Sequence, residues 1–163
     1  ADIAHGASQK VKFLARSHVT DFMPMTKRNP LIFEGVIKAW ESVLSDANIT
    51  LDALSFAEVH DCFTIAELMI YESMGLTPLG EGARAINEGW VMKEGRLPIN
   101  PSGGLKAKGH PVGATGVSMH VMAARQLLNT AEGCQIEDAH TGAVFNMGGL
   151  AVANYASLLQ RVG

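Results

Sequence analysis

Short strand-like runs alternate along this chain with segments of helical periodicity, and this alternation restricts the fold more than any other feature. Apolar residues at every second position, or in brief continuous runs, indicate strands, whereas apolar residues three and four apart indicate helices. The predicted strands are 11–15, 54–59, 143–146 and 151–159, and the predicted helices are 30–47, 64–75, 83–87 and 115–128.

Local signals fix the expected ends of these elements. Asn29 before Pro30 is typical of a helix start, because Asn caps a helix and proline suits its first position. Thr64 and Glu67 have the spacing of a capping box, and Gly75 suits the residue that follows a helix. The order is interpreted as βαβαβαββ, with one strand more than the four ranges above, and it predicts an α/β domain whose mostly parallel sheet has helices on its faces and one antiparallel edge strand.

Composition excludes several classes of protein. The 163 residues carry 13 basic and 16 acidic side chains, a net charge of −3, with no basic run that would favour nucleic acid. No apolar run reaches the length of a membrane span. The two cysteines are too few for a disulfide framework, so we expect a reducing, cytoplasmic location. Because the chain starts at Ala1 without a targeting pattern, we expect it to be a piece of a larger protein.

Three segments are candidates for chemistry, and the first is His60-Asp61-Cys62-Phe63. It falls between a predicted strand and a predicted helix, where ligands gather in layered α/β domains. The positive end of the helix dipole would favour a thiolate at Cys62, which could then exchange protons near neutral pH. The alternative is a buried cysteine that acts as a small hydrophobic side chain.

The second and third candidates are rich in glycine. His110 lies in Gly109-His-Pro-Val-Gly-Ala-Thr-Gly116, where glycines let a ligand approach the backbone and the imidazole could donate to an oxyanion. Its alternatives are a turn histidine or a phosphate loop, although no Gly-Lys-Ser/Thr follows. In Asn146-Met-Gly-Gly149, Gly148 could offer a backbone N–H to a ligand or simply form a hairpin turn. No histidine spacing predicts a metal site.

Taken together, these motifs resemble the C-terminal half of a thiolase, and most closely the branch of the sterol-carrier-protein-2-type thiolases. The resemblance runs from about Val11 to Leu159 and rests on His-Asp-Cys-Phe63, Asn100-Pro-Ser-Gly-Gly104, Gly109–Gly116 and Asn146–Gly148. Most thiolases carry Asn-Glu-Ala-Phe at the first motif and Cys-x-Gly at the last. The resemblance implies one domain over residues 1–163, built as a five-stranded mixed sheet. The N-terminal half, which carries the nucleophilic cysteine, would then lie outside this chain.

The resemblance also implies roles for four residues in Claisen condensation or thiolysis. Cys62 would take the acid/base role of the Cys-x-Gly cysteine, because Asn146 stands at that position in this chain. His110, with His60 or a water held by it, would stabilise the enolate oxygen of a coenzyme A thioester. The N–H of Gly148 would contribute to a second oxyanion hole. No cofactor would be covalently bound, no metal is expected, and residues that contact coenzyme A are not assigned.

The resemblance further implies an acyl-CoA substrate, homo-oligomers and no turnover by the 163 residues alone. Two alternatives differ in class. One is a thiolase-like aldolase of the steroid side-chain type, which cleaves a coenzyme A thioester without an acyl-enzyme and works beside a small OB-fold partner. The other is a non-catalytic thiolase-like subunit. The helix at 115–128 would expose an apolar face when separated from the other half.

Overall fold

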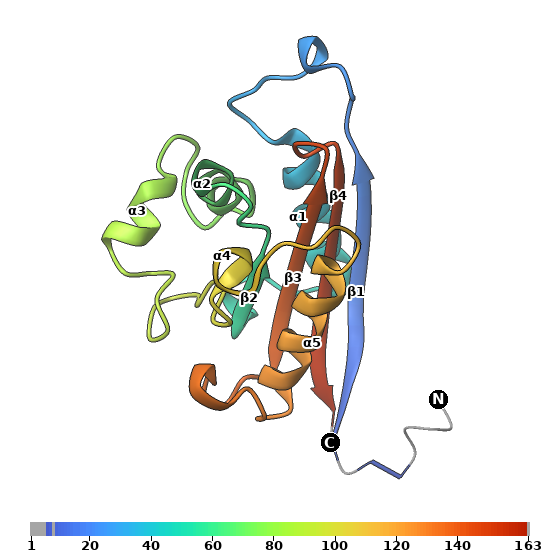
Figure 1. The fold of residues 1–163 in the computed structure, drawn as a ribbon, viewed down its shortest axis with the longest axis vertical. Coiled ribbons are helices and arrows are strands. Elements are labelled where there is room, and N and C mark those ends of the chain that lie inside the picture. Colours follow the sequence, from blue (N-terminus) through green and yellow to red (C-terminus); the bar gives the residue numbers. More distant parts are fainter. Residues whose placement is uncertain (1–5, 8, 163) are drawn as a thin grey trace.

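The computed structural model describes residues 6–7 and 9–162, which form one four-stranded sheet flanked by helices (Figure 1). Single 3-10 turns lie at Met25–Lys27, Leu51–Ala53 and Glu132–Cys134. The strands are β1 (Lys10–Thr20), β2 (Phe56–Val59), β3 (Thr141–Gly148) and β4 (Ala153–Val162), and the helices are α1 (Glu34–Ala47), α2 (Thr64–Ser73), α3 (Gly82–Asn87), α4 (Gly104–Lys108) and α5 (Thr115–Leu127).

The sheet is mixed, with strand order β1-β4-β3-β2. β2 and β3 pair in parallel, whereas β4 pairs antiparallel with both β3 and β1. β1, β2 and β3 therefore run in one direction and β4 in the other, as the closing hairpin requires. The mixed α/β class and the predominant strand direction are confirmed. The prediction that the antiparallel strand lies at the edge is wrong, because β4 lies between β1 and β3.

The expected fifth strand is reduced to a single bridge. Ala57 in β2 pairs in parallel with Ile99, through hydrogen bonds from Ala57 N to Pro98 O at 2.9 Å and from Asn100 N to Ala57 O at 2.8 Å. Asn100 then adopts a φ of 51°. This left-handed conformation turns the chain away from the sheet edge before a ladder can extend. The described chain thus has four strands instead of five.

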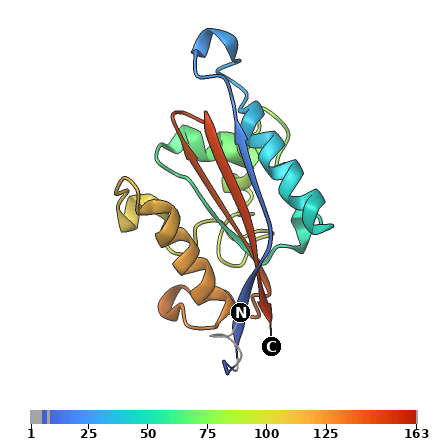
Figure 2. The ribbon, with the colours of Figure 1, turned by 90° about the vertical axis from the view of Figure 1, so that its right-hand side faces the viewer.

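Helices cover both faces of the sheet, as the element order predicts. Figure 2 shows α1 and α5 on opposite sides, with the strands between them. One core packs α1 and α2 against the sheet around Trp40, Ile70 and Phe145, and the other packs α5 around Phe56 and Met119. Successive strand residues point to opposite faces, and all four residues of β2 are buried. His60 directly follows this buried strand.

The start of α1 differs from its sequence signal, whereas the start of α2 is confirmed without its predicted cap. α1 begins at Glu34 instead of Pro30, because Asn29 closes a turn in which its Oδ1 accepts from Leu31 N at 3.0 Å. α2 begins at Thr64, but no side-chain bond caps it, and Glu67 instead accepts from Asn100 Nδ2 at 3.1 Å. The predicted end of this helix is confirmed.

Only one side of α5 is buried. Met119, Ala123 and Leu127 pack against the sheet, whereas Val117 is 66% exposed and Val121 is 46% exposed. The expectation of burial around most of this helix is therefore wrong for the described residues, because they cover it on one side. The expected exposed apolar face is present. Separately, none of the described helices combines the length and apolar character that crossing a membrane requires.

Candidate active site

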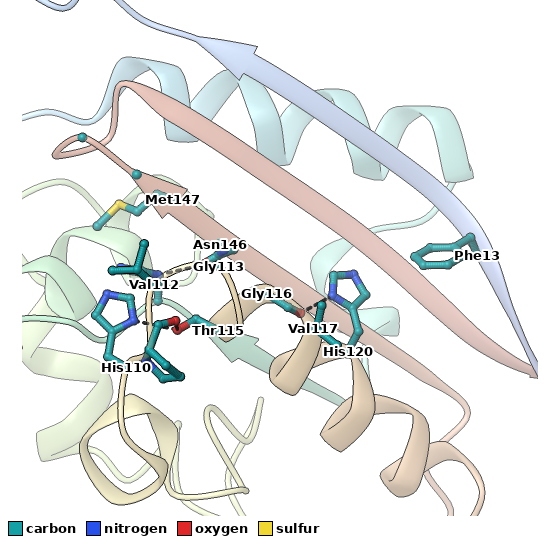
Figure 3. Close-up of a pocket in the computed structure, with 14 residues that line it drawn as sticks. Phe13, His110, Val112, Gly113, Thr115, Gly116, Val117, His120, Asn146 and Met147 are labelled. Carbon is teal, nitrogen blue, oxygen red and sulfur yellow. Dashed lines mark hydrogen bonds between the residues drawn. The ribbon is translucent and has the colours of Figure 1, made fainter.

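A cavity of about 760 Å³ opens beside the carboxyl end of β3, at the start of α5 (Figure 3). Three loops meet there: the one after β2, the one between α4 and α5, and the turn between β3 and β4. The loops and the end of β3 bring together His60 and His110 with Asn146 and Gly148, which are far from them in the sequence. The site therefore unites residues from all three predicted segments.

His60 enters the cavity from the end of β2 and is 5% exposed. Its Nδ1 lies 2.6 Å from Oδ1 of Asn146 on β3. Because an amide oxygen only accepts hydrogen bonds, His60 Nδ1 donates here. Burial lowers the pKa of His60 from its ordinary value of 6.5, an effect that the Asn146 hydrogen bond opposes and the neighbouring His110 reinforces. His60 is therefore neutral at neutral pH.

His110 reaches the same cavity from the loop between α4 and α5. Its Nδ1 lies 2.7 Å from the Thr115 hydroxyl, and Figure 3 shows the two side chains together. The rings of His60 and His110 are 4.8 Å apart between centroids and meet edge to face at 82°. Two imidazoles from different loops thus form one polar corner in the cavity.

Two carboxylates tie the His110 loop to β2. Asp61, which is buried, accepts from Leu105 N at 2.7 Å near the start of α4, and a side chain at Gly104 would collide with it. Glu58, which is fully buried, accepts from Ser102 Oγ at 2.6 Å and from Lys108 Nζ at 3.1 Å. The position of His110 therefore depends on α4, which these carboxylates hold in place.

Sequence reasoning missed these anchors, along with the roles of Thr115 and Asn146 as partners of the histidines. One signal was available: Glu58 is a carboxylate inside a strand predicted to be buried, and a buried carboxylate needs a cationic or hydrogen-bonding partner. No such signal marks Thr115, because threonine is common at the first turn of a helix.

Cys62 follows His60 by two residues but does not line the cavity. Its side chain is partly buried and packs against both cores. Burial is the main cause that raises the pKa of Cys62, with a further contribution from the Asp61 charge, while the backbone N–H of Phe63 opposes it. The thiol is therefore the resting form, in contrast to the thiolate that the helix dipole led us to expect.

Gly148 lines the cavity and is exposed. A Cβ at this position would meet nothing within 4 Å, and its φ lies outside the left-handed region. The described chain thus has neither a steric nor a conformational need for glycine at 148.

The remaining histidines and Cys134 have local partners. His120 Nδ1 donates to Gly116 O at 2.6 Å at the far side of the cavity, and His18 stacks on Tyr155. Cys134 Sγ donates to Ala131 O at 3.2 Å, and His5 lies outside the described residues. Within residues 6–7 and 9–162, no three His, Cys, Asp or Glu side chains are grouped to hold a metal ion.

Comparison with known families decides the membership of the chain. The model of the family described as thiolase C-terminal domain-like matches residues 17–161. The chain belongs to this family. The match contains both cavity histidines, Cys62 and Gly148, so the motifs that carried the resemblance all lie inside the thiolase C-terminal domain.

Curated proteins agree with this membership. An acetyl-CoA acetyltransferase of Methanothermobacter thermautotrophicus is 37% identical over 123 residues, which cover 76% of this chain and 32% of that protein. Human sterol carrier protein 2 is 34% identical over 145 residues, covering 86% of this chain and 26% of the relative. The benzoylsuccinyl-CoA thiolase subunit BbsB of Thauera aromatica is 37% identical over 92 residues, 56% of this chain and 24% of that subunit.

The thiolase-type fold is also seen in a solved structure, the Ltp2-ChsH2(DUF35) aldolase. It superposes with a TM-score of 0.81 at 19% identity, covering 92% of this chain and 39% of the aldolase chain. At this identity the likeness concerns the fold alone. The matched region spans between 26% and 32% of the acetyltransferase and of sterol carrier protein 2.

Proposed function

We propose that this thiolase domain is the C-terminal catalytic half of an acyl-CoA C-acyltransferase that makes or cleaves 3-oxoacyl-CoA. One observation carries the proposal: His60 and His110 meet at 4.8 Å in a cavity that Gly148 also lines. Claisen chemistry needs hydrogen-bond donors for an enolate oxygen and for the oxyanion of a tetrahedral intermediate. In this proposal the two sides of the cavity supply donors for both.

In this proposal His110 stabilises the enolate oxygen. When a 3-oxoacyl-CoA is cleaved, the bond between its α-carbon and its keto carbon breaks, and the electron pair moves onto the thioester as an enolate. A donor aimed at that oxygen is stronger in the transition state than in the ground state, which accelerates the step. His60, neutral and hydrogen-bonded to Asn146, would hold a water that donates to the same oxygen.

Gly148 would donate from its backbone N–H to the second oxyanion, which forms on the acyl carbon. The nucleophile that bears this acyl group would come from an N-terminal half, as the resemblance to thiolases implies. Neither Cys62 nor Cys134 lies in the motif of the nucleophilic cysteine. Open space where a Cβ would stand leaves room for an acylated cysteine to approach the backbone closely.

Cys62 would supply and remove the α-proton. A resting thiol is the form that protonates the enolate during thiolysis, and the resulting thiolate then takes a proton from the attacking thiol of coenzyme A. The raised pKa of Cys62 therefore supports the acid role first. Because Cys62 is not among the residues that line the cavity, this role requires the bound thioester to reach beyond that lining.

The remaining expectations belong to this proposal. Residues 1–163 would form one domain, and an N-terminal half would complete the site. The substrate would be an acyl-CoA, no cofactor would be covalently attached, and the assembled enzyme would be a cytoplasmic homo-oligomer. The exposed apolar side chains of α5 support burial against another part of the assembly.

The position of Cys62 outside the cavity lining favours one second candidate, a thiolase-like aldolase acting on a coenzyme A thioester. Such an enzyme cleaves a carbon–carbon bond without an acyl-enzyme and has less need of this thiol. An OB-fold partner would then be expected, and the name Ltp2-ChsH2(DUF35) aldolase joins two components in a protein of similar fold. A non-catalytic subunit is the third possibility, and it would not need paired histidines in a cavity.

One experiment separates these candidates in the full-length protein that contains this chain. Acetoacetyl-CoA is added with free coenzyme A, thiolysis is followed, and the protein is examined by mass spectrometry for a covalent acyl group. We expect thiolysis with an acyl-enzyme. Cleavage of a β-hydroxyacyl-CoA without an acyl-enzyme would instead favour the aldolase, and absence of both activities would favour the non-catalytic subunit.

A further inference from the structure

The two cavity histidines differ in the chemistry of their hydrogen-bond partners. Nδ1 of His60 faces an amide oxygen, which can only accept, at 2.6 Å. Nδ1 of His110 faces a hydroxyl group, Thr115 Oγ1, which can donate or accept, at 2.7 Å. In a neutral imidazole the partner of one nitrogen determines whether the other nitrogen carries the proton. These two contacts therefore decide what each ring offers to a ligand.

The Thr115 hydroxyl has one proton and two acceptors within reach. Besides Nδ1 of His110, the carbonyl oxygen of Pro111 lies 3.1 Å away. That carbonyl already accepts from the backbone N–H of Ala114 at 3.1 Å and of Thr115 at 3.2 Å. A carbonyl oxygen has two lone pairs, so it is satisfied without the hydroxyl. The hydroxyl is within donating distance of both acceptors, and the shorter distance, 2.7 Å, favours Nδ1 of His110 as the acceptor of its single proton.

The surroundings of Thr115 hold this hydroxyl in place. Thr115 is 4% exposed and is the first residue of α5. Its β-branched side chain has few rotamers in a helix, and the oxygen is fixed between the two acceptors. Thr115 thus keeps its hydroxyl beside Nδ1 of His110, although His110 itself is exposed.

We propose that Thr115 and Asn146 are positioning residues that hold the two histidines in opposite neutral tautomers. Thr115 donates to Nδ1 of His110, which leaves an Nε2–H donor for a ligand oxygen. Asn146 accepts from Nδ1 of His60, which leaves an unprotonated Nε2 as an acceptor. The corner of the cavity then combines one donor and one acceptor at a ring-to-ring distance of 4.8 Å.

The pairing has a direct chemical consequence. An acceptor at His60 orients a water so that the second hydrogen of that water points away from the ring, toward the oxygen that His110 also faces. Two donors then converge on one ligand oxygen. This use of the tautomers rests on the proposed function, whereas the tautomers themselves do not.

The first test measures the tautomers without any variant and without activity. Full-length protein with ¹⁵N-labelled histidine is examined by two-bond ¹H–¹⁵N correlation spectra near neutral pH, with His60→Gln and His110→Gln spectra to assign the signals. We expect the proton on Nε2 of His110 and on Nδ1 of His60. A proton on Nδ1 of His110, or on Nε2 of His60, would overturn the assignment for that ring.

The second test replaces the hydroxyl. Thr115→Val keeps the shape of the side chain, and Thr115→Ser keeps the hydroxyl. We expect Val to move the His110 proton toward Nδ1 and to lower kcat for thiolysis by about tenfold or more, which is less than the loss of the donor itself. KM should change little, and Ser should restore both the tautomer and most of kcat. Thr130→Val is the matched control, because the exposed hydroxyl of Thr130 donates to the Arg125 carbonyl.

The outcomes separate this proposal from the proposed function. Unchanged His110 tautomer and unchanged kcat in Thr115→Val would overturn the role of Thr115, and an unchanged His60 tautomer in Asn146→Leu would overturn that of Asn146. If Thr115→Val does not fold, Thr115→Ala and the wild-type spectrum provide the same decision. If the tautomers are as predicted but the protein shows no thiolysis, the positioning roles stand and only the proposed function is contradicted.

Discussion

The histidine corner is the residue-scale feature on which the proposed chemistry depends most. His60 and His110 come from loops 50 residues apart in the chain numbering, yet their rings are 4.8 Å apart. Each ring has its own side-chain partner, so neither relies on the other for orientation. Removing one ring should therefore remove one donor or acceptor and leave the other ring in place.

For His110 we expect Ala substitution to lower kcat for thiolysis on the order of a hundredfold, because an oxyanion donor is lost. Steady-state kinetics with acetoacetyl-CoA on the full-length enzyme measures this change. His140→Ala is the control, since His140 is exposed and its ring is hydrogen-bonded to Arg161. A fall in thermal stability with kcat unchanged would assign His110 a purely structural role.

Replacement of Gly148 by Ala tests close approach of a ligand. A Cβ there meets nothing within 4 Å in the described chain, so the midpoint of thermal unfolding should hardly change. Activity should nevertheless fall by about tenfold or more, because the methyl group occupies the space beside the second oxyanion donor. Gly133→Ala, also without a neighbour within 4 Å, is the matched control. Full activity in Gly148→Ala would argue against this oxyanion hole.

Burial of His60 predicts a pH-dependent stability. Because its pKa in the folded protein lies below the ordinary value of 6.5, the unfolded chain binds more protons between these two values. The free energy of unfolding should therefore fall as pH is lowered through this window and stay constant above it. Thermal unfolding of the full-length protein at about pH 7.5 and about pH 5 measures the difference. His60→Gln should lose less stability on acidification; an equal loss would contradict the prediction.

At the scale of elements, α4 determines where His110 lies. This five-residue helix is too short to be stable by itself, so it depends on its contacts with β2. Asp61 accepts the Leu105 N–H, and Glu58 binds Ser102 and Lys108. The carboxylates next to the cavity thus act on the architecture of the loop and need not touch a substrate.

We expect Asp61→Ala to destabilise the protein by about 2 kcal/mol, because a buried backbone N–H loses a charged acceptor. The same variant should lower kcat, since the loop that carries His110 is released from β2. Chemical denaturation and steady-state kinetics on the full-length protein measure both effects. Asp52→Ala removes an exposed ion pair with Arg96 and should cost at most about 1 kcal/mol. Equal effects of the two substitutions would remove the anchoring role of Asp61.

The sequence predicted the elements better than their pairing. Periodicity located all the long helices and both strands of the closing hairpin, because each has a distinct apolar pattern. It could not show that β4 inserts between β1 and β3, since strand order depends on contacts between distant residues. It also missed that Asn100 turns the chain away after one bridge, because a left-handed asparagine has no sequence signature of its own.

The candidate site was predicted in part. Glycine-flanked His110 and the His60–Cys62 segment stood out by residue type and spacing, and the structure places His60 and His110 in one cavity. The resting state of Cys62 was missed, since the helix dipole argument ignored the burial that raises its pKa. Hydrogen-bond partners such as Thr115 and Asn146 became visible only in three dimensions.

At the scale of the whole molecule, the domain leaves apolar surface uncovered. Val117 and Val121 on α5 and Phe13 on β1 are largely exposed. Surface of this kind is typical of an interface with another part of an assembly. The chain matches only 26% to 32% of the acetyltransferase and of sterol carrier protein 2, and the proposed N-terminal half would cover this surface.

We therefore expect the isolated 163-residue chain to associate and to lack thiolysis. Light scattering after gel filtration measures the association, and Val117→Lys with Val121→Lys should reduce it by placing charge on the apolar face. Lys substitutions at the already polar exposed positions Glu132 and Glu137 form the control pair. A monomeric wild-type chain would contradict the expected interface, and thiolysis by this chain alone would contradict the need for a second half.

Exchange of the α-proton measures the proposed acid/base role of Cys62 directly. Full-length enzyme and its Cys62→Ala variant are incubated with acetyl-CoA in D₂O, and deuterium in the acetyl group and covalent acylation of the protein are followed by mass spectrometry. We expect the variant to lose exchange, because the acid/base is gone, yet still to form the acyl-enzyme. Exchange that survives in Cys62→Ala would contradict it, because another group would then move the proton.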